Sequence, residues 1–223
     1  MDTNLLSNTF VDLADTMVAD FDVIDFLHLL TDRSVALLGA SAAGVVLANP
    51  RGELRVAAAS TEEAGLLELF QLQNDQGPCL ECFRTGRPVT AADLAGPAPR
   101  WPRFAAAATR SGFRTVQALP MRLRDQVIGA LNLFRAGPGP FEAADLRIAQ
   151  ALADVATIGL LHERSVRRRE TVAERLSIDM DRAFSMIRDY ARNTNQHLTD
   201  VARDFVNGAT AEFPPPARRQ PGR

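Results

Sequence analysis

Cys79 and Cys82 are the residues whose type and spacing most directly suggest chemistry in this sequence. A CxxC pair can ligate zinc, but a zinc site needs two further ligands, and His28, His162 and His197 lie far along the chain without ligand-like spacing. At the start of a helix, the Cys79 thiol could have a lowered pKa and act as a redox sensor. Free cysteines also serve as small hydrophobic core residues. We therefore expect no metal and no cofactor, and the pair is either a redox site or part of the core.

Catalytic side chains do not come together in this sequence. The three histidines lie on separate predicted helices and the carboxylates are scattered, so neither a nucleophile with a paired base nor a close acid–base pair emerges. The stretch 137–140 (GPGP) is not a phosphate loop, because its prolines lack the N–H groups that bind phosphate. We therefore expect a protein without enzymatic activity.

The composition is that of a folded protein, because 46% of the 223 residues are apolar and can bury a core. All 25 basic residues are arginine, a bias that indicates a GC-rich coding genome. Charge is unevenly distributed: residues 161–223 hold 12 arginines against 9 acidic residues, whereas the whole chain has a net charge of −2. This mildly basic C-terminal end favours a nucleic-acid or other acidic partner.

Membrane and export signals are not found in the sequence. A transmembrane helix needs roughly eighteen or more apolar residues, and the longest candidate, 35–48, is interrupted by Ser41 and two glycines. The N-terminus has no basic region followed by an apolar stretch, so no secretory signal is predicted. Two cysteines cannot form a disulfide framework, which fits a reducing compartment. We expect a cytoplasmic protein without membrane contact.

Helices are predicted near the N-terminus, where apolar residues recur at spacings of three to five. They cover residues 8–18 and 23–39, with Asp22 as the N-cap of the second helix and Gly39 at its end. A further amphipathic helix is predicted over 61–73, with its first residue, a threonine, as the cap. Leu66 is assigned to the apolar face of that helix.

Two β-hairpins are predicted from short apolar runs that end at turn residues. The first pairs 43–49 with 54–59, and the second pairs 115–121 with 127–134. Antiparallel hairpins with helices grouped on one face indicate an α+β domain with an antiparallel sheet and flanking helices.

A long helical pattern begins at Glu142 and extends to Leu176. Positions at alternating spacings of three and four over 152–176 would form the seam of a dimeric coiled coil. Five of them suit such a seam (Leu152, Val155, Val166, Ala173 and Leu176), and three do not (Gly159, His162 and Arg169). The alternative is a helix that only closes the domain. Two shorter helices, predicted over 180–192 and 198–206, form a small all-α C-terminal segment. The proline- and arginine-rich tail at 209–223 is predicted to be disordered.

Three stretches of this sequence resemble the GAF domains of actinobacterial regulators. They are residues 76–89 (QGPCLECFRTGRPV), 126–134 (QVIGALNLF) and 141–145 (FEAAD). The resemblance covers residues 8–161. It implies a sensor domain for a small-molecule or protein signal that remains unknown.

Aromatic residues of this GAF-like part could line a ligand pocket, because such pockets combine apolar walls with a few polar groups. For each of them, plain core packing is the alternative interpretation. The candidate pocket residues are Phe83, Trp101, Phe104 and Phe113.

Residues 178–192 (IDMDRAFSMIRDYAR), with Asn195 and residues 198–202, resemble the second and third helices of the ANTAR module, an RNA-binding domain of transcription antiterminators. The ANTAR-like segment is 177–208, and 142–176 becomes the connecting helix. Proteins that combine the two modules sense a signal in the GAF domain, dimerise, and bind paired RNA hairpins so that a terminator cannot form. The resemblance therefore implies a homodimer whose partner is RNA.

Four residues of this segment are candidate RNA contacts. Arg188 and Arg192 are four residues apart, so they share one helix face and could contact phosphates. Tyr190, the only tyrosine, could stack on an unpaired base, and Asn193 could read a base edge. The alternative for the two arginines is a solvated surface.

The sequence departs from the ANTAR pattern before residue 177. The family's first helix carries an Ala-Lys-Gly motif among basic residues, whereas here 167–171 (RRRET) leads directly to 172–176 (VAERL), and the chain has no lysine. The sequence reads as though about twenty residues, or five to six helical turns, were absent. The alternative function is therefore a non-enzymatic GAF-type regulator that binds a ligand or a protein and has lost RNA binding.

Overall fold

The computed structural model describes residues 3–16, 22–176 and 180–206. The chain divides into two compact units, Met1–Leu160 and Leu161–Arg223. The long helix predicted from Glu142 is α6, Ala143–Leu176, and the boundary between the two units falls within it. The tail for which disorder is predicted, 209–223, lies outside the described residues.

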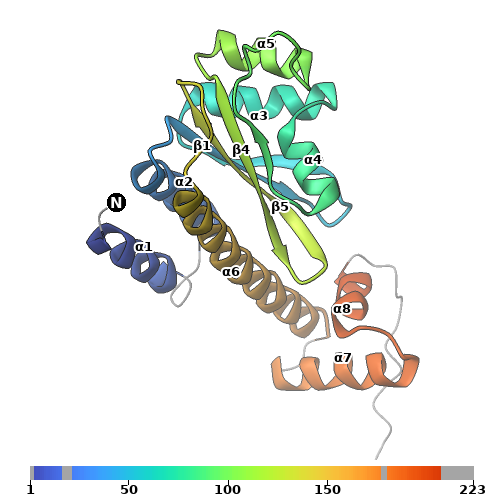
Figure 1. Ribbon diagram of the computed structural model, residues 1–223. Coiled ribbons are helices and arrows are strands. Elements are labelled where there is room, and N and C mark those ends of the chain that lie inside the picture. Colours follow the sequence, from blue (N-terminus) through green and yellow to red (C-terminus); the bar gives the residue numbers. More distant parts are fainter. Residues whose placement is uncertain (1–2, 17–21, 177–179, 207–223) are drawn as a thin grey trace, which may run out of the picture. The chain divides into compact units, whose positions relative to one another are not determined.

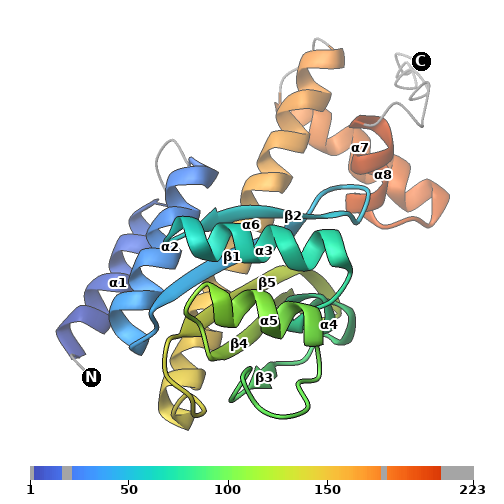
Figure 2. The same ribbon diagram turned by 90° about the horizontal axis from the view of Figure 1, so that it is seen from above.

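The first unit is built on an antiparallel sheet, which has five strands among the described residues, in the order β2-β1-β5-β4-β3 (Figures 1 and 2). The strands are β1 Ala42–Ala48, β2 Leu54–Ala59, β3 Val89–Ala91, β4 Thr115–Leu123 and β5 Gln126–Arg135. The two predicted hairpins are β1–β2 and β4–β5, and β1 pairs with β5 to join them. The central strand of the sheet is therefore β5.

Helices cover both faces of this sheet (Figures 1 and 2). One face carries α3 Glu62–Asn74, α4 Pro78–Thr85 and α5 Pro102–Arg110, and the other carries α2 Val23–Leu38 and the first half of α6. The helix α1 Thr3–Thr16 packs beside α2, where Arg33 donates to Asp12 at 2.6 Å. The predicted α+β class with an antiparallel sheet, flanking helices, a long helix and a C-terminal helical part is confirmed. The prediction that the helices group on one face is wrong, because α3 and α4 pack on the face opposite α2.

The predicted helix caps form as expected. Asp22 accepts hydrogen bonds from the N–H groups of Ile24 (2.7 Å) and Asp25 (3.2 Å), and Gly39 ends α2 in the left-handed conformation at φ 57°. Thr61 accepts from the N–H of Ala64 at 3.2 Å and so caps α3. These local interactions fix where α2 and α3 start, and so which of their faces can meet the sheet.

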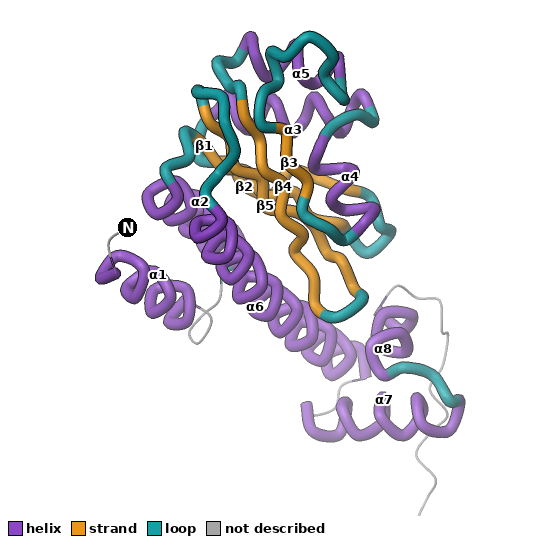
Figure 3. The backbone as a smooth tube through the Cα atoms, viewed as in Figure 1, coloured by secondary structure: helices purple, strands orange, loops and turns teal. Residues whose placement is uncertain are grey.

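The second unit contains α7 Met180–Thr194 and α8 Leu198–Val206, joined by a short loop (Figure 3). The two helices pack through the buried side chains of Ile187, Ala191, Val201 and Ala202. In α6, the seam positions that favoured a coiled coil have mixed surroundings: Leu152 is buried in the first unit, and His162 is exposed. The coiled coil stays a prediction.

Candidate functional site

Helix α3 buries two polar residues. Ala64, Leu67, Glu68 and Gln71 are buried, and their spacings of three and four residues place them on one face of the helix. Leu66, which the sequence places on the apolar face, is 59% exposed, so that prediction is wrong. The helix is turned so that a carboxyl and an amide are buried beside Leu67, while Leu66 faces solvent.

Glu68 is the centre of hydrogen bonds that link three elements. Nδ2 of Asn132, on β5, donates to Oε1 of Glu68 at 2.7 Å, and Nε2 of Gln71 donates to Oε2 at 2.5 Å. Oε1 of Gln71 accepts the backbone N–H of Cys79, at the start of α4, at 3.2 Å. We call these four fully buried residues the Glu68 cluster.

Two glycines allow the Glu68 cluster to pack closely. Gly44 on β1 pairs with Asn132 in the sheet, and a Cβ at Gly44 would lie 2.6 Å from Oε1 of Glu68. A Cβ at Gly77 would lie 2.2 Å from Oε1 of Gln71. Both distances are shorter than a non-bonded contact allows, so a side chain at either glycine would displace a member of the cluster.

The ionisation of Glu68 is shifted by its surroundings. Removal from water disfavours the charged carboxylate, while the hydrogen bonds from Asn132 and Gln71 favour it, and the balance raises the pKa of Glu68 to about 7. Within the described ranges, no charged side chain influences this pKa. The carboxyl therefore changes protonation near neutral pH, which is a property common at functional sites.

Both cysteines lie in the core as free thiols. Burial, and then the nearby Glu68, raise the pKa of the Cys79 thiol well above its ordinary value. Burial likewise raises the pKa of Cys82 to about 12. The thiolate is the reactive form of cysteine. These surroundings therefore favour the core interpretation of Cys79 and Cys82 and disfavour the redox one.

The predicted pocket aromatics are mostly core residues. Trp101, Phe104 and Phe113 belong to one buried apolar cluster, in which the ring of Phe113 lies 5.2 Å from that of Phe134. Phe83 is half-buried and lies outside this cluster. The arrangement favours core packing for the three buried residues, and a ligand-binding role for any of the four stays a prediction.

A hollow of about 210 Å³ lies beside Trp101, between the start of α4 and the start of α5. Arg100 lies over the Trp101 ring at 5.1 Å and forms an ion pair with Glu81 at 2.7 Å. Oε1 of Gln76 accepts the N–H of Arg103 at 2.8 Å and so caps α5. The volume is below the roughly 300 Å³ at which pockets for drug-sized ligands begin, so the hollow suits a small polar molecule at most.

Arg135, at the end of β5, connects the sheet to the helices of its other face. Its guanidinium donates to the carbonyls of Leu38 and Gly39, both at 3.0 Å, where α2 ends. It also lies 3.8 Å from the centre of the Phe141 ring and 3.8 Å from the carboxylate of Asp145 in the first turn of α6. One side chain thus joins the central strand, the end of α2 and the beginning of α6.

In the second unit, the end of α7 shapes a hollow. Asn195 adopts the left-handed conformation at φ 53°, and the N–H of Gln196 donates to the carbonyl of Ala191 at 2.9 Å, as in a Schellman motif. The carbonyl of His197 then accepts from the N–H groups of Asp200 and Val201, so His197 is the N-cap residue directly before α8. The chain reverses within three residues, so these residues border the same hollow as the end of α7.

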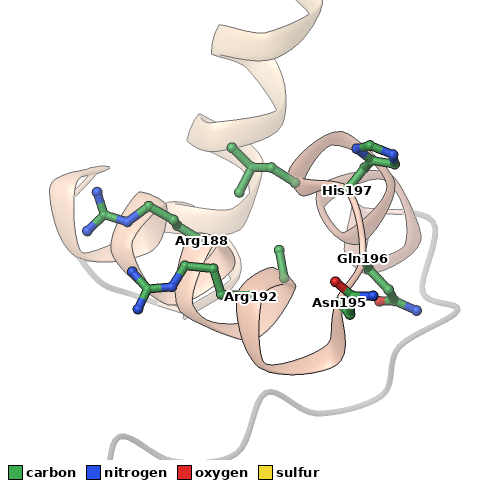
Figure 4. Close-up of a pocket in the computed structure, with 7 residues that line it drawn as sticks. Arg188, Arg192, Asn195, Gln196 and His197 are labelled. Atoms are coloured by element: carbon green, nitrogen blue, oxygen red, sulfur yellow. The ribbon is translucent and has the colours of Figure 1, made fainter.

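The hollow between α7 and α8 has a volume of about 510 Å³. Figure 4 shows Arg188 and Arg192 along one side and the loop residues Asn195, Gln196 and His197 along the other. All five side chains are exposed. Two cations, two amides and an imidazole therefore border one space that is open to solvent.

Only part of the predicted RNA-binding set borders this hollow. Arg188 and Arg192 line it, whereas Tyr190 and Asn193 do not. Each helical residue is rotated by about 100° from the preceding one, which turns Tyr190, two residues beyond Arg188, to the opposite side of α7. Sequence reasoning missed the three loop residues, although an Asn and a Gln directly after a helix are a signal for a turn that presents side-chain amides.

No group of three or more His, Cys, Asp or Glu residues that could hold a metal ion occurs in the described part of the chain. None of the helices described by the structure combines the length and the apolar character needed to cross a membrane.

Comparison with known families assigns both units. The model of the GAF domain matches residues 22–160, and the model of the ANTAR domain matches residues 170–206. The first match covers the first unit apart from α1, and the second begins inside α6 and extends over α7 and α8. No curated protein matches the chain.

Solved structures share the fold of the first unit. The GAF domain of a phosphoenolpyruvate-protein phosphotransferase from Coxiella burnetii is 15% identical with a TM-score of 0.56, over 74% of this chain and 98% of that chain. The free methionine-R-sulfoxide reductase of Neisseria meningitidis is 15% identical with a TM-score of 0.55, over 74% and 95%. A GAF domain/HD domain protein from Geobacter sulfurreducens is 24% identical with a TM-score of 0.53, over 64% and 94%. At these identities the likeness concerns the fold alone.

Proposed function

This chain belongs to the GAF domain family and carries an ANTAR domain behind its GAF domain, and on that premise we propose that it is a non-enzymatic, signal-responsive regulator of transcription antitermination. The GAF domain senses a signal, and α7 and α8 bind an RNA hairpin. Because the proposed target is a nascent transcript, the proposed place of action is the cytoplasm, and the resemblance of the GAF motifs supports an actinobacterial source. The observation that carries the proposal is the hollow bordered by Arg188, Arg192 and the loop that begins α8.

The chemistry of this hollow fits an RNA loop. Guanidinium groups bind phosphate oxygens, and amide side chains read the edges of unpaired bases. Arg188 and Arg192 supply the first kind of contact, and Asn195 and Gln196 supply the second. A volume of about 510 Å³ lies within the range of small-molecule pockets, roughly 300–1,000 Å³, so a single extruded base has room.

The local charge limits the affinity of one such site. Asp189 is exposed between the two arginines in sequence, and Arg203 is held by Asp200 at 3.0 Å, so the positive field comes mainly from Arg188 and Arg192. Two phosphate contacts give weak and salt-sensitive binding. A protein with one weak site per chain gains affinity when two linked copies engage two linked hairpins.

We therefore propose that the chain acts as a homodimer on paired RNA hairpins. Exposed apolar side chains on the helices of one sheet face support this: Val11 of α1, Ile24 of α2 and Ile158 of α6 are 56%, 62% and 53% exposed. The seam pattern of α6 supports a coiled coil between the two copies.

The test measures binding of the full chain to a panel of paired RNA hairpins over a range of salt concentrations. Saturable binding that weakens with salt is expected, and Arg188→Ala/Arg192→Ala should reduce the slope of log affinity against log salt by about 2, because two phosphate contacts are lost. Arg122→Ala/Arg124→Ala, which removes two exposed arginines of the β4–β5 hairpin, is the matched control and should bind like the parent. Equal binding by both variants would overturn the assignment of the hollow.

A second candidate function rests on the sequence before α7. The ANTAR match begins inside α6, and the stretch 167–176 lacks the basic Ala-Lys-Gly motif of the family's first helix. On this view the first helix of the ANTAR domain is shortened and RNA binding is lost. The protein is then a GAF-type regulator whose output is contact with a ligand or a protein. Absence of RNA binding even at low salt would favour this candidate.

A further inference from the structure

The Glu68 cluster has hydrogen bonds suited to one protonation state of its carboxyl. Both oxygens of Glu68 accept N–H groups, from Asn132 at 2.7 Å and from Gln71 at 2.5 Å, which is the arrangement of a carboxylate. The carboxyl is nevertheless fully buried without a cation, and its pKa is raised to about 7. Protonated and ionised forms are therefore both populated near neutral pH, and the protonated form needs an acceptor for its O–H.

Asn132 can supply that acceptor, and Gln71 cannot. The amide of Gln71 is held in its orientation at both ends, because Oε1 accepts the Cys79 N–H at 3.2 Å while Nε2 donates to Glu68. Oδ1 of Asn132 is buried and has no hydrogen-bond partner in the part of the chain that the structure describes. A half-turn of the Asn132 amide would exchange Nδ2 for Oδ1 beside Oε1 of Glu68, so that the new O–H has a partner.

The surroundings of the cluster do not compete for this proton. The thiols of Cys79 and Cys82, on α4, are the titratable groups beside it, and their raised pKa values keep them protonated when Glu68 titrates. Strand β1 contributes Gly44 at the closest point and therefore no ionisable group. Among the described residues, neither a cation nor a second carboxylate influences the pKa of Glu68.

We propose that the Glu68 cluster is a proton switch, in which proton uptake by Glu68 is accompanied by a half-turn of the Asn132 amide, and that proton concentration is a signal this GAF domain senses. The step is balanced: a proton from solvent forms an O–H bond at Oε1, the Nδ2–H···Oε1 hydrogen bond breaks, and an Oε1–H···Oδ1 hydrogen bond replaces it. The Asn132 side chain also interacts with the thiol of Cys79, so the half-turn changes that contact as well.

The position of the switch connects it to the output helix. Asn132 lies on the central strand β5, three residues before Arg135, whose guanidinium contacts the end of α2 and Asp145 in the first turn of α6. Side chains alternate between the two faces of a strand, so Asn132 and Arg135 face opposite layers of helices. A change in hydrogen bonding at Asn132 therefore acts on the strand that positions the start of α6. Only the further step, from α6 to the RNA affinity of α7 and α8, rests on the proposed function.

The primary test follows side-chain carboxyl and amide signals of the full chain by NMR as pH is varied. One carboxyl is expected to titrate with a midpoint near 7, and the side-chain amide of Asn132 should shift with the same midpoint. Both titrations should vanish in Glu68→Gln and persist in Glu63→Gln, which removes an exposed carboxyl from the same helix. A Glu68 midpoint near its ordinary value of 4.5, or an Asn132 amide that does not respond, would overturn the proposal.

A second variant keeps the test decisive if Glu68→Gln does not fold. Asn132→Ala retains the carboxyl but removes a hydrogen bond that favours its ionised form, so the Glu68 midpoint should rise above that of the parent. An unchanged midpoint would show that Asn132 is not coupled to the proton and would overturn the switch.

An RNA arm separates this proposal from the proposed function. The affinity for the paired hairpins should differ between about pH 6 and about pH 8 in the parent and be less pH-dependent in Glu68→Gln. If the parent and Glu68→Gln bind RNA with the same dependence on pH, the signalling role is overturned. If RNA does not bind at all, antitermination fails, while the NMR midpoint still decides whether the switch exists.

Discussion

Replacing Glu68 by glutamine should remove a large pH dependence from the stability of the GAF domain. In the unfolded chain this carboxyl has its ordinary pKa of 4.5, and in the folded chain the pKa is about 7. The folded state therefore retains the proton to higher pH than the unfolded state does. The free energy of unfolding must then fall as pH rises through this window, and level off above the folded pKa.

The magnitude is set by the two pKa values. At about 1.4 kcal/mol per pH unit, the interval from 4.5 to about 7 corresponds to about 3 kcal/mol of unfolding free energy. This is a substantial share of the 5–15 kcal/mol by which domains are typically stable (about 0.1 kcal/mol per residue). A loss of this size is large enough to be resolved by denaturant titration.

The assay is urea unfolding of the full chain at several pH values, followed by the fluorescence of Trp101, the only tryptophan, which is buried. The difference in unfolding free energy between the parent and Glu68→Gln should change by about 3 kcal/mol across the window. Glu63→Gln should behave like the parent, because that carboxyl is exposed. A constant difference between the parent and Glu68→Gln would refute the reasoning.

Three further outcomes are expected. Gly44→Ala should lower the unfolding free energy of the GAF domain by about 2 kcal/mol in urea unfolding, because the new Cβ would lie 2.6 Å from Glu68. The loss should be smaller in a protein that also carries Glu68→Ala. Additive losses would contradict the close contact. Arg135→Ala should lower the unfolding free energy by about 2 kcal/mol, because its hydrogen bonds to the end of α2 are lost. Arg135→Lys should lower it less, because the positive charge is kept. Equal decreases in the two variants would argue against a role for that charge. Cys79 and Cys82 should react with a thiol reagent no faster than the domain unfolds, and rapid reaction of the native protein would revive a redox role.

The local parts of the fold could be predicted because their causes are local. Asp22 and Thr61 cap helices through bonds to residues two or three positions away, and Gly39 ends α2 because it tolerates a positive φ. The hairpins are indicated by turn residues between short apolar runs. In contrast, β3 and α5 were not predicted, since a strand of three residues has no measurable period and α5, with nine residues, is shorter than the window over which a helical period is read.

The candidate sites were predicted only where helical spacing defines them. Arg188 and Arg192 are a pair that the sequence already places on one face, but their loop partners depend on the turn at Asn195. Glu68 was missed because a glutamate among leucines is usually exposed on a helix, and its partner Asn132 is 64 residues away. Packing of α3 on β1 and pairing of β1 with β5 together bring these residues into contact, and such non-local contacts leave no signal in a single sequence.

The continuity of α6 has a consequence for how such proteins can be recombined. Its 34 residues include the boundary between the two units and the first residues of the ANTAR match. Each residue inserted there would rotate the remainder of the helix by about 100°, whereas seven residues amount to almost two full turns. A GAF domain from another protein could therefore replace this one only if the connecting helix kept its phase, and hybrids with helices differing by whole heptads should be the ones that retain regulation.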